Sequence, residues 1–146
     1  MKAALRCALV LLTLSTVLSP AVANAEQKRV FGDFEVHYIV LPTTFLRPDV
    51  ANRYSITRAQ DRALINISVL DGNGEPVAAR VTGRGENLLG QLQTLSFREV
   101  REPPAIYYLA LLRHSDEEHI RFQIDVELPD GMPAQLEFQQ KLYWKD

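Results

Sequence analysis

The sequence has 146 residues, with 16 Lys and Arg, 18 Asp and Glu, three His and one Cys. This length suits one domain, and it excludes a TIM barrel or a dinucleotide-binding fold that carries a separate substrate domain. The net charge of -2 lacks the basic excess with which proteins bind the phosphates of nucleic acids, so we expect no nucleic-acid partner.

Residues 1–25 have the organisation of a secretory signal peptide. A short basic start is followed by an apolar run from Leu5 to Leu18, and Ala23-Asn24-Ala25 forms a small-residue cleavage site. We expect cleavage after Ala25 and no stable membrane anchor afterwards, because the apolar run is shorter than the ~20 residues that span a bilayer. An uncut membrane anchor is the alternative.

Cleavage would change the composition of the chain. The mature protein, residues 26–146, lacks Lys2 and Arg6, so 14 basic residues remain against 18 acidic ones. It also lacks Cys7, the single cysteine. We therefore expect no disulfide, no thiol chemistry and no thiolate metal site, and stability must come from an apolar core.

Alternation of apolar and polar residues predicts half-buried β-strands along the mature chain. The clearest is Ile120 to Leu128, whereas Ala105 to Leu112 is apolar on both faces and is expected to be a central strand. Seven strands are predicted, over residues 34–41, 63–70, 76–81, 95–101, 105–112, 120–128 and 136–144. The pattern favours an all-β fold, an antiparallel two-sheet sandwich of immunoglobulin-like architecture, with a small barrel as the alternative.

The segments between the strands have their own signals. The residues from Asp71 to Gly74 are typical of a hairpin turn, and Asp130-Gly131 is typical of a second turn. The residues from Ser115 to Glu118 are typical of a short charged loop between strands. Leu46 to Tyr54 predicts a short helix at one end of the sandwich, because a proline stands in its first turn and is followed by an aspartate. Glu26 to Arg29 is expected to be a loose N-terminus.

Several short motifs carry a family resemblance over essentially the whole mature chain. They are His37-Tyr38, Thr43-Thr44-Phe45-Leu46, Pro48, Val50-Ala51, Tyr54, Ile56, Arg58, Asn66-Ile67-Ser68-Val69, Asn87-Leu88, Gly90-Gln91-Leu92, Phe97-Arg98-Glu99-Val100, Ile106-Tyr107-Tyr108-Leu109-Ala110 and Phe138-Gln139-Gln140. With these motifs the chain resembles domain-of-unknown-function family 4426, a family of small exported proteobacterial proteins. The resemblance implies a periplasmic single-domain β protein of Gram-negative type. It implies no activity and no catalytic residues.

Two histidines flank the charged loop at residues 115–118. If this loop is a hairpin, His114 and His119 face each other with their Cβ atoms about 5 Å apart. Acidic residues of the loop, Asp116 to Glu118, would add oxygen ligands, and such a set suits Zn²⁺ or Cu²⁺. A solvated charged loop is the alternative. His37 lies on the polar face of its predicted strand, where it is either a binding or acid-base residue or simply bonded to a neighbour.

The irregular segment 43–58 is the best candidate for a binding surface, since functional residues favour loops held on rigid scaffolds. Its candidate binding residues are Thr44, Phe45, Asn52, Arg53 and Arg58. Two structural roles are the alternatives. Phe45 and Tyr54 could plug the end of the core, and Arg58 could pair with an inward-facing carboxylate such as Glu99.

No catalytic motif is present in the sequence. It contains neither a nucleophile elbow nor a phosphate-binding loop, and Gly83-Arg84-Gly85 suits a β-bulge or a strand end. We therefore expect that the protein is not an enzyme and needs no cofactor. The sequence favours an exported, non-catalytic module that binds a protein or peptide, through a sheet edge or through segment 43–58. A periplasmic protein that binds a small ligand or a metal, Zn²⁺ or Cu²⁺, is the alternative.

Overall fold

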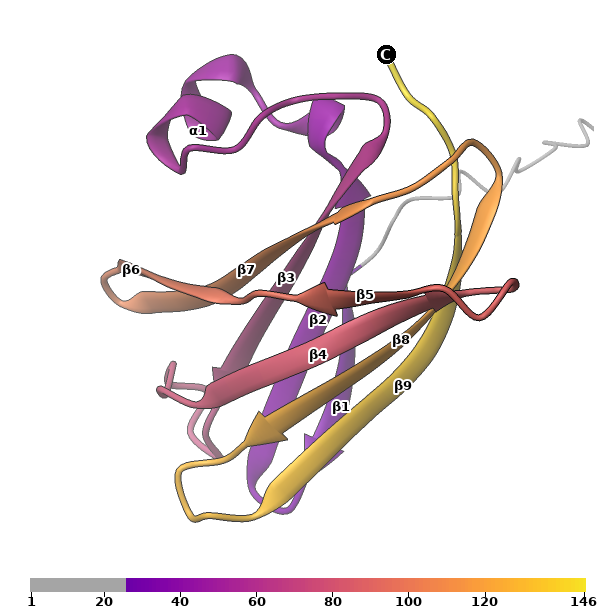
Figure 1. Cartoon of the computed structure of the whole chain (residues 1–146). Coiled ribbons are helices and arrows are strands. Elements are labelled where there is room, and N and C mark those ends of the chain that lie inside the picture. The colour runs from indigo at the N-terminus through magenta and orange to yellow at the C-terminus, as the bar shows by residue number, and fades with distance from the viewer. Residues whose placement is uncertain (1–25) are drawn as a thin grey trace, which may run out of the picture.

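The computed structural model describes residues 26–146, so the predicted signal peptide and its cleavage site lie outside the described residues. Within this part of the chain, two antiparallel sheets pack face to face (Figure 1). The strands are β1 (Gln27–Phe31), β2 (Phe34–Pro42), β3 (Arg62–Leu70), β4 (Arg80–Asn87), β5 (Leu92–Leu95), β6 (Arg98–Glu102), β7 (Ala105–Arg113), β8 (Glu118–Glu127) and β9 (Pro133–Leu142). A 3-10 turn, η1 (Thr43–Phe45), and a helix, α1 (Pro48–Arg53), follow β2.

The strand order explains why the fold is a sandwich. The larger sheet has the order β1-β2-β3-β7-β6, and the smaller has the order β5-β4-β8-β9. Each sheet ends in two edge strands, so the predicted two-sheet architecture is confirmed, and the small barrel is not the observed fold. The edges β1 and β9 belong to different sheets, and they lie on the same side of the molecule (Figure 1).

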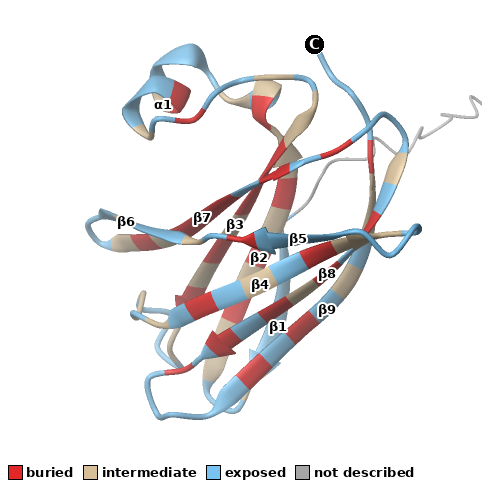
Figure 2. Cartoon of the chain, viewed as in Figure 1, coloured by how far each residue is buried: buried red, intermediate tan, exposed pale blue. Residues whose placement is uncertain are grey.

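The core lies between the inner faces of the sheets, where buried and exposed residues alternate along the strands (Figure 2). In β8, Ile120, Phe122, Ile124 and Val126 are buried and their neighbours point to solvent or are half-buried, as the sequence pattern predicts. Burial of these side chains supplies about 1.5–3 kcal/mol each. The central place of β7 is also confirmed, because it pairs with both β3 and β6.

A second, smaller cluster covers the outer face of the larger sheet. Ala51 of α1 and Ile56 after it pack on Leu64 and Leu109, which point away from the main core. The predicted helix is confirmed, with Pro48 at its first position. Its place differs from the prediction, because α1 covers the outer face near one end of the sheet and does not close the end of the sandwich (Figure 1).

Three sequence predictions of strand positions were wrong. The predicted loose N-terminus is largely β1, whose residues are mostly exposed and so lack the alternation by which strands are recognised. The predicted strand 95–101 divides at Ser96 and Phe97 into β5 and β6, which belong to different sheets. The strand predicted at 76–81 begins only at Arg80 and continues to Asn87.

The glycines of β4 explain why this strand was misplaced. Gly83 and Gly85 lie inside β4 rather than at a strand end or bulge. A Cβ atom on Gly83 would stand 2.9 Å from the carbonyl oxygen of Gln123, and one on Gly85 would stand 2.6 Å from Leu112 Cδ1. Close approach of neighbouring groups, rather than a turn, therefore requires glycine at both positions.

The turns agree in part with prediction. At Asp71 to Gly74 a tight turn forms, with the Gly74 N–H donating to the Asp71 carbonyl at 2.9 Å. The chain then crosses to the other sheet after a single bridge between Leu70 and Pro76, so the predicted hairpin is incomplete. Asp130-Gly131 does connect the paired strands β8 and β9. Among the described residues, no helix is long and apolar enough to cross a membrane.

Candidate binding groove

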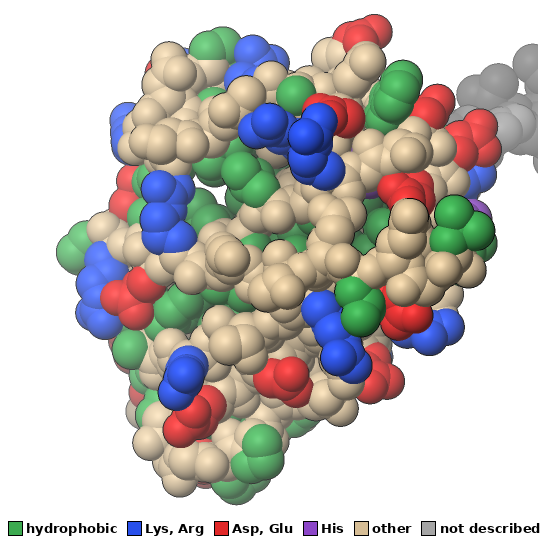
Figure 3. All heavy atoms as spheres, in the orientation of Figure 1, with side chains coloured by type: hydrophobic (Ala, Val, Ile, Leu, Met, Phe, Trp, Pro, Cys, Tyr) green, Lys and Arg blue, Asp and Glu red, His purple; other side chains and the backbone are tan. Residues whose placement is uncertain are grey.

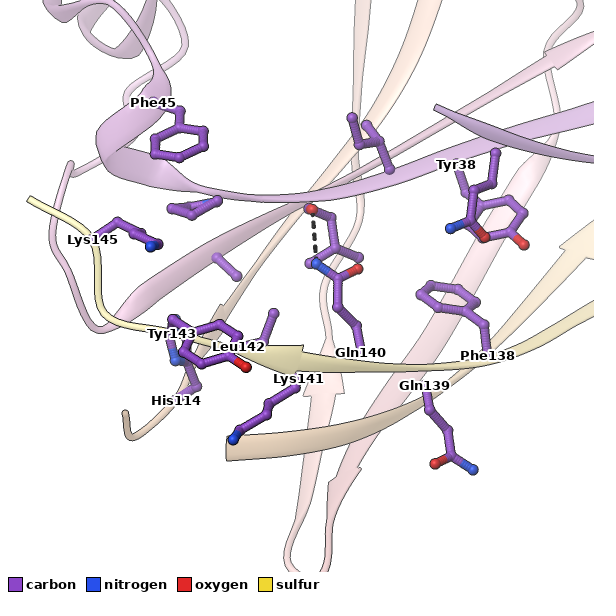
Figure 4. Close-up of a pocket in the computed structure, with 15 residues that line it drawn as sticks. Tyr38, Phe45, His114, Phe138, Gln139, Gln140, Lys141, Leu142, Tyr143 and Lys145 are labelled. Carbon is purple, nitrogen blue, oxygen red and sulfur yellow. Dashed lines mark hydrogen bonds between the residues drawn. The ribbon is translucent and has the colours of Figure 1, made fainter. Parts of the chain in front are cut away.

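A groove of about 680 Å³ opens between β2 and β9 on the side of the sandwich where β1 and β9 are the edges. Figure 4 shows its two ends. Tyr38 and Phe138 lie at one end, and His114, Tyr143 and Lys145 lie at the other. The groove therefore joins an end formed by two packed aromatic rings to an end that also carries imidazole and ammonium groups.

The groove exists because β1 is shorter than the strand it pairs with. The last pair between them is Gln27 with Tyr38, whereas β2 continues to Pro42 and pairs there only with β3. The Val40 carbonyl accepts a hydrogen bond from Gln140 Nε2 at 3.2 Å across the groove (Figure 4). In an antiparallel strand the N–H and C=O of one residue point to the same side, so the Val40 N–H also faces the open side. Among residues 26–146, residues 39–42 therefore have no partner strand on the β1 side, and we call this segment the unpaired half of β2.

Apolar and aromatic side chains form the floor of the groove. The rings of Tyr38 and Phe138 are 4.7 Å apart between centroids and tilted by 31°. Val40 and Leu142 add buried aliphatic surface from the two facing strands. Phe45, from η1, stands at the rim with 58% of its surface exposed, so it does not plug the core as one alternative predicted.

His114 is a buried polar residue on the wall of the groove, with 6% of its surface exposed. Its Nδ1 lies 2.8 Å from the Ser115 carbonyl, which can only accept, so Nδ1 carries the proton. In the neutral ring the other nitrogen, Nε2, is then an acceptor or a metal ligand. His114 is held in place further, because its carbonyl accepts from Trp144 Nε1 at 3.3 Å.

The predicted pairing of His114 with His119 does not form. β7 and β8 belong to different sheets, so residues 115–118 form a crossover and not a hairpin. His114 continues the inner face of β7, whereas His119 is exposed on the outer face of β8 and borders a separate, shallower pocket. Within residues 26–146, no three His, Cys, Asp or Glu side chains gather in a way that could hold a metal ion.

The lining of the groove contains two lysines, Lys141 and Lys145, but no Asp or Glu. The surface seen in Figure 3 differs, since basic and acidic side chains are interspersed there. Lys141 donates to Glu117 at 2.7 Å, and this bond raises the pKa of the lysine. Lys145 has no ion-pair partner among the described residues, and its Nζ lies 5.8 Å from the centre of the Tyr143 ring.

His37 lies outside the groove, on the outer face of β2. Its Nε2 is 3.0 Å from Glu35 Oε2 and its Nδ1 is 3.5 Å from Glu26 Oε1, and 19% of its side chain is exposed. The pKa of Glu35 is lowered, first by its hydrogen bond from Lys28 and then by the bond to His37. This geometry supports the interpretation of His37 as a residue bonded to its neighbours.

Segment 43–58 contributes mainly to its own structure. Arg58 Nη2 donates to the Thr44 carbonyl at 2.9 Å, so the predicted pair of Arg58 with Glu99 is wrong. Asn52 is exposed, and Arg53 lies 3.6 Å from Glu102 of β6. Glu99 instead accepts from Tyr108 and from Arg101.

Tyr54 is half-buried against the outer cluster, so it does not plug the core either. Of the residues predicted to bind in segment 43–58, Phe45 alone lines the groove.

Several groove residues were not predicted from the sequence, namely Gln140, Lys141, Tyr143 and Lys145. The sequence predicts only a half-buried strand over residues 136–144, without its place in a sheet, and Lys145 lies beyond this strand. The missing information was the length of β1, because a groove follows only when one knows that β2 extends beyond its partner. No local pattern in the sequence carries that difference.

Comparisons with known proteins agree with the fold. A crystal structure of a DUF4426 family protein from Pseudomonas aeruginosa is 36% identical, with a TM-score of 0.75, over 83% of this chain and 97% of that one. FetP from a uropathogenic Escherichia coli strain, expressed in the periplasm, has a TM-score of 0.61 at 13% identity, over 84% of this chain and 96% of FetP.

A copper-bound variant of FetP has a TM-score of 0.59 at 14% identity, over 82% of this chain and 95% of the variant. At such low identity these two structures show a shared fold. No curated protein sequence matches the chain. The model of the family described as domain of unknown function DUF4426 matches residues 28–145, nearly all of the described part. The chain therefore belongs to the DUF4426 family.

Proposed function

We propose that the protein is an exported, periplasmic, non-catalytic module that binds a polypeptide segment of another protein in the groove between β2 and β9. One observation carries the proposal. Strand edges bound the groove on both sides, because, among the described residues, residues 39–42 of β2 have no partner strand on the β1 side and β9 is the edge of its sheet. Unpaired edges accept extended segments through backbone hydrogen bonds, and adjacent pockets select side chains.

The side chains at the rim support the same role. Phe45 and Tyr143 are exposed aromatic residues beside the groove. Exposed aromatic residues are enriched where proteins bind other proteins, since they bury a large area at a low entropic cost. The periplasmic location is supported by the predicted signal peptide and by the fold shared with FetP.

Site-specific photo-crosslinking tests the proposal in cells. A photoreactive amino acid replaces Phe45 at the rim or, as control, Arg84 on the exposed face of β4. The full chain is expressed with its own leader, and crosslinked species are identified by mass spectrometry. We expect a reproducible protein adduct from position 45 that is absent from position 84. Adducts that are the same at both positions, or at neither, would contradict a binding groove.

Binding of copper or zinc is a second candidate function. It is supported by the Nε2 atom of His114 at the groove wall and by the fold shared with a copper-bound FetP variant. One imidazole falls short of the three or four ligands of most zinc sites. Calorimetric titration of Cu²⁺ or Zn²⁺ into the mature protein and into His114→Gln tests this candidate. Heat that is lost in the variant would support it, whereas no heat above buffer in the unmodified protein would exclude it.

A further inference from the structure

We infer that the segment bound in the groove is extended and acidic, and that it adds to the unpaired half of β2 with a carboxylate directed to Lys145. This inference rests on the proposed function and names the class of partner. It follows from where the mature chain begins, from the charges of the groove and from the difference between its two ends.

The expected cleavage site coincides with the point where β2 loses its partner. Gln27 pairs with Tyr38, so the preceding residue, Glu26, lies opposite Ile39. If the leader is removed after Ala25, the mature chain starts at Glu26 and has no residues with which to cover Val40 or Pro42. The unpaired half of β2 then lies open to a segment from another chain, in line with β1.

The charges of the groove favour an acidic occupant. Lys141 is already paired with Glu117, but Lys145 has no acidic partner among the described residues. Cleavage would add a second positive charge, because the new α-amino group of Glu26 lies next to Gln27, which lines the groove. A carboxylate of the partner would neutralise these charges in a half-enclosed site, where screening by solvent is reduced.

The two ends of the groove suit different side chains of one extended segment. An apolar side chain opposite Val40 would face inward, against Phe138 and Leu142, because paired residues of neighbouring strands point to the same face. At the other end, Tyr143 and Lys145 lie beside His114 (Figure 4). A segment in line with β1 runs antiparallel to β2, from the Lys145 end of the groove toward Tyr38. An alternating segment in which an acidic residue precedes the apolar one therefore matches the order of the groove.

Peptide binding to the mature protein, residues 26–146, tests the inference. The probes are two ten-residue peptides that alternate valine with threonine and carry fluorescein at the C-terminus, one with two glutamates near its N-terminal end and one with glutamines instead. Fluorescence anisotropy measures binding at low and high salt. We expect the glutamate peptide to bind about threefold more tightly, the preference typical of a partly exposed ion pair, and the preference to vanish in high salt.

Two variants locate the effect. Lys145→Gln should abolish the preference for glutamate, and Arg84→Gln, which removes an exposed charge from β4, should retain it. Hydrogen exchange should show new protection of the Val40 amide when the glutamate peptide binds, since strand addition engages this N–H. The N–H groups of Ile39 and Leu41 point to β3 instead, and Pro42 has none. Loss of the preference in Arg84→Gln, or no new protection of the Val40 amide, would overturn the inference.

The remaining outcomes separate this inference from the proposed function. Equal affinity for both peptides, abolished by Phe45→Ala, would overturn the acidic preference and leave the groove as a peptide site. Binding of neither peptide would count against both. A dimer found by light scattering and broken by Phe45→Asp would assign the groove to a second copy of the chain, and would overturn the acidic partner.

Discussion

At the scale of single residues, Tyr108 links the two sheets. Its hydroxyl accepts a hydrogen bond from the Ala79 N–H at 2.8 Å, just before β4, and lies 3.1 Å from Glu99 Oε2 of β6, to which it donates. The side chain is buried, and burial is the main reason why its pKa is raised. The pKa of Glu99 is lowered, first by Arg101 and then by this tyrosine. A single hydroxyl therefore satisfies groups from both layers.

We predict that Tyr108→Phe lowers the free energy of unfolding by about 1–2 kcal/mol, because the Ala79 N–H would lose its partner in a partly buried position. Urea denaturation measures the effect. Tyr107→Phe is the matched control, since no hydrogen bond joins the Tyr107 hydroxyl to the described part of the chain. Equal effects of the two substitutions would show that the bonds of Tyr108 contribute nothing specific.

At the scale of elements, the segment from η1 through α1 to Ile56 packs on the outer face of the larger sheet, apart from the main core. Ala51 and Ile56 are its buried apolar residues, and both belong to the small outer cluster rather than to the main core. Thr43 also holds the segment in place. Its hydroxyl donates to the Ala59 carbonyl at 3.0 Å and accepts from the Ala59 N–H at 3.0 Å. A unit with so few buried contacts is expected to open more easily than the main core.

We predict that Ile56→Ala releases this segment before it affects the rest of the fold. Removal of a buried isoleucine costs about 2–5 kcal/mol, and the cost should fall mainly on the local opening of residues 43–58. Hydrogen exchange with mass spectrometry should show faster exchange there, with unchanged exchange in β8. Faster exchange throughout the molecule would mean that the outer cluster and the main core unfold as one unit.

The elements also show how far the sequence determines the structure. Strands with a buried face, such as β8, and the helix that begins at Pro48 follow from local periodicity and from turn chemistry. Three features depend on distant partners and were not predictable. β1 is an exposed edge, Gly83 lies inside a strand because Gln123 comes so close, and the 115–118 loop crosses between sheets. The predicted histidine pair failed for the last of these reasons.

At the scale of the whole molecule, surface ion pairs lower the pKa of three carboxyls, and one of these pairs joins segments that are distant in sequence. Asp61, before β3, accepts from Arg113 at the end of β7, with Nη2 at 2.9 Å from Oδ2, and this bond is the main reason why the pKa of Asp61 is lowered. Glu35 and Glu99 also have lowered pKa values, through Lys28 and Arg101 respectively. All three carboxyls bind protons more readily in the unfolded chain than in the folded one.

We predict that the protein loses stability in acid through these three groups. A carboxyl whose pKa is lower when folded stabilises the protein fully above its unfolded pKa, at about 4, and this contribution disappears as the pH falls through the folded pKa. Urea midpoints should therefore be similar at pH 7 and pH 6 and fall steadily below about pH 4.5. Added salt should reduce the difference, because all three pairs are at the surface.

Asp61→Asn separates the contribution of one pair from the rest. The amide cannot titrate, so the variant should be less stable than the unmodified protein at pH 7 and should lose less stability between pH 5 and pH 3. Asp33→Asn is the control, since Asp33 is an exposed aspartate without an ion-pair partner in residues 26–146. If both variants follow the same acid curve as the unmodified protein, the bond between Arg113 and Asp61 does not link the folding of this protein to pH.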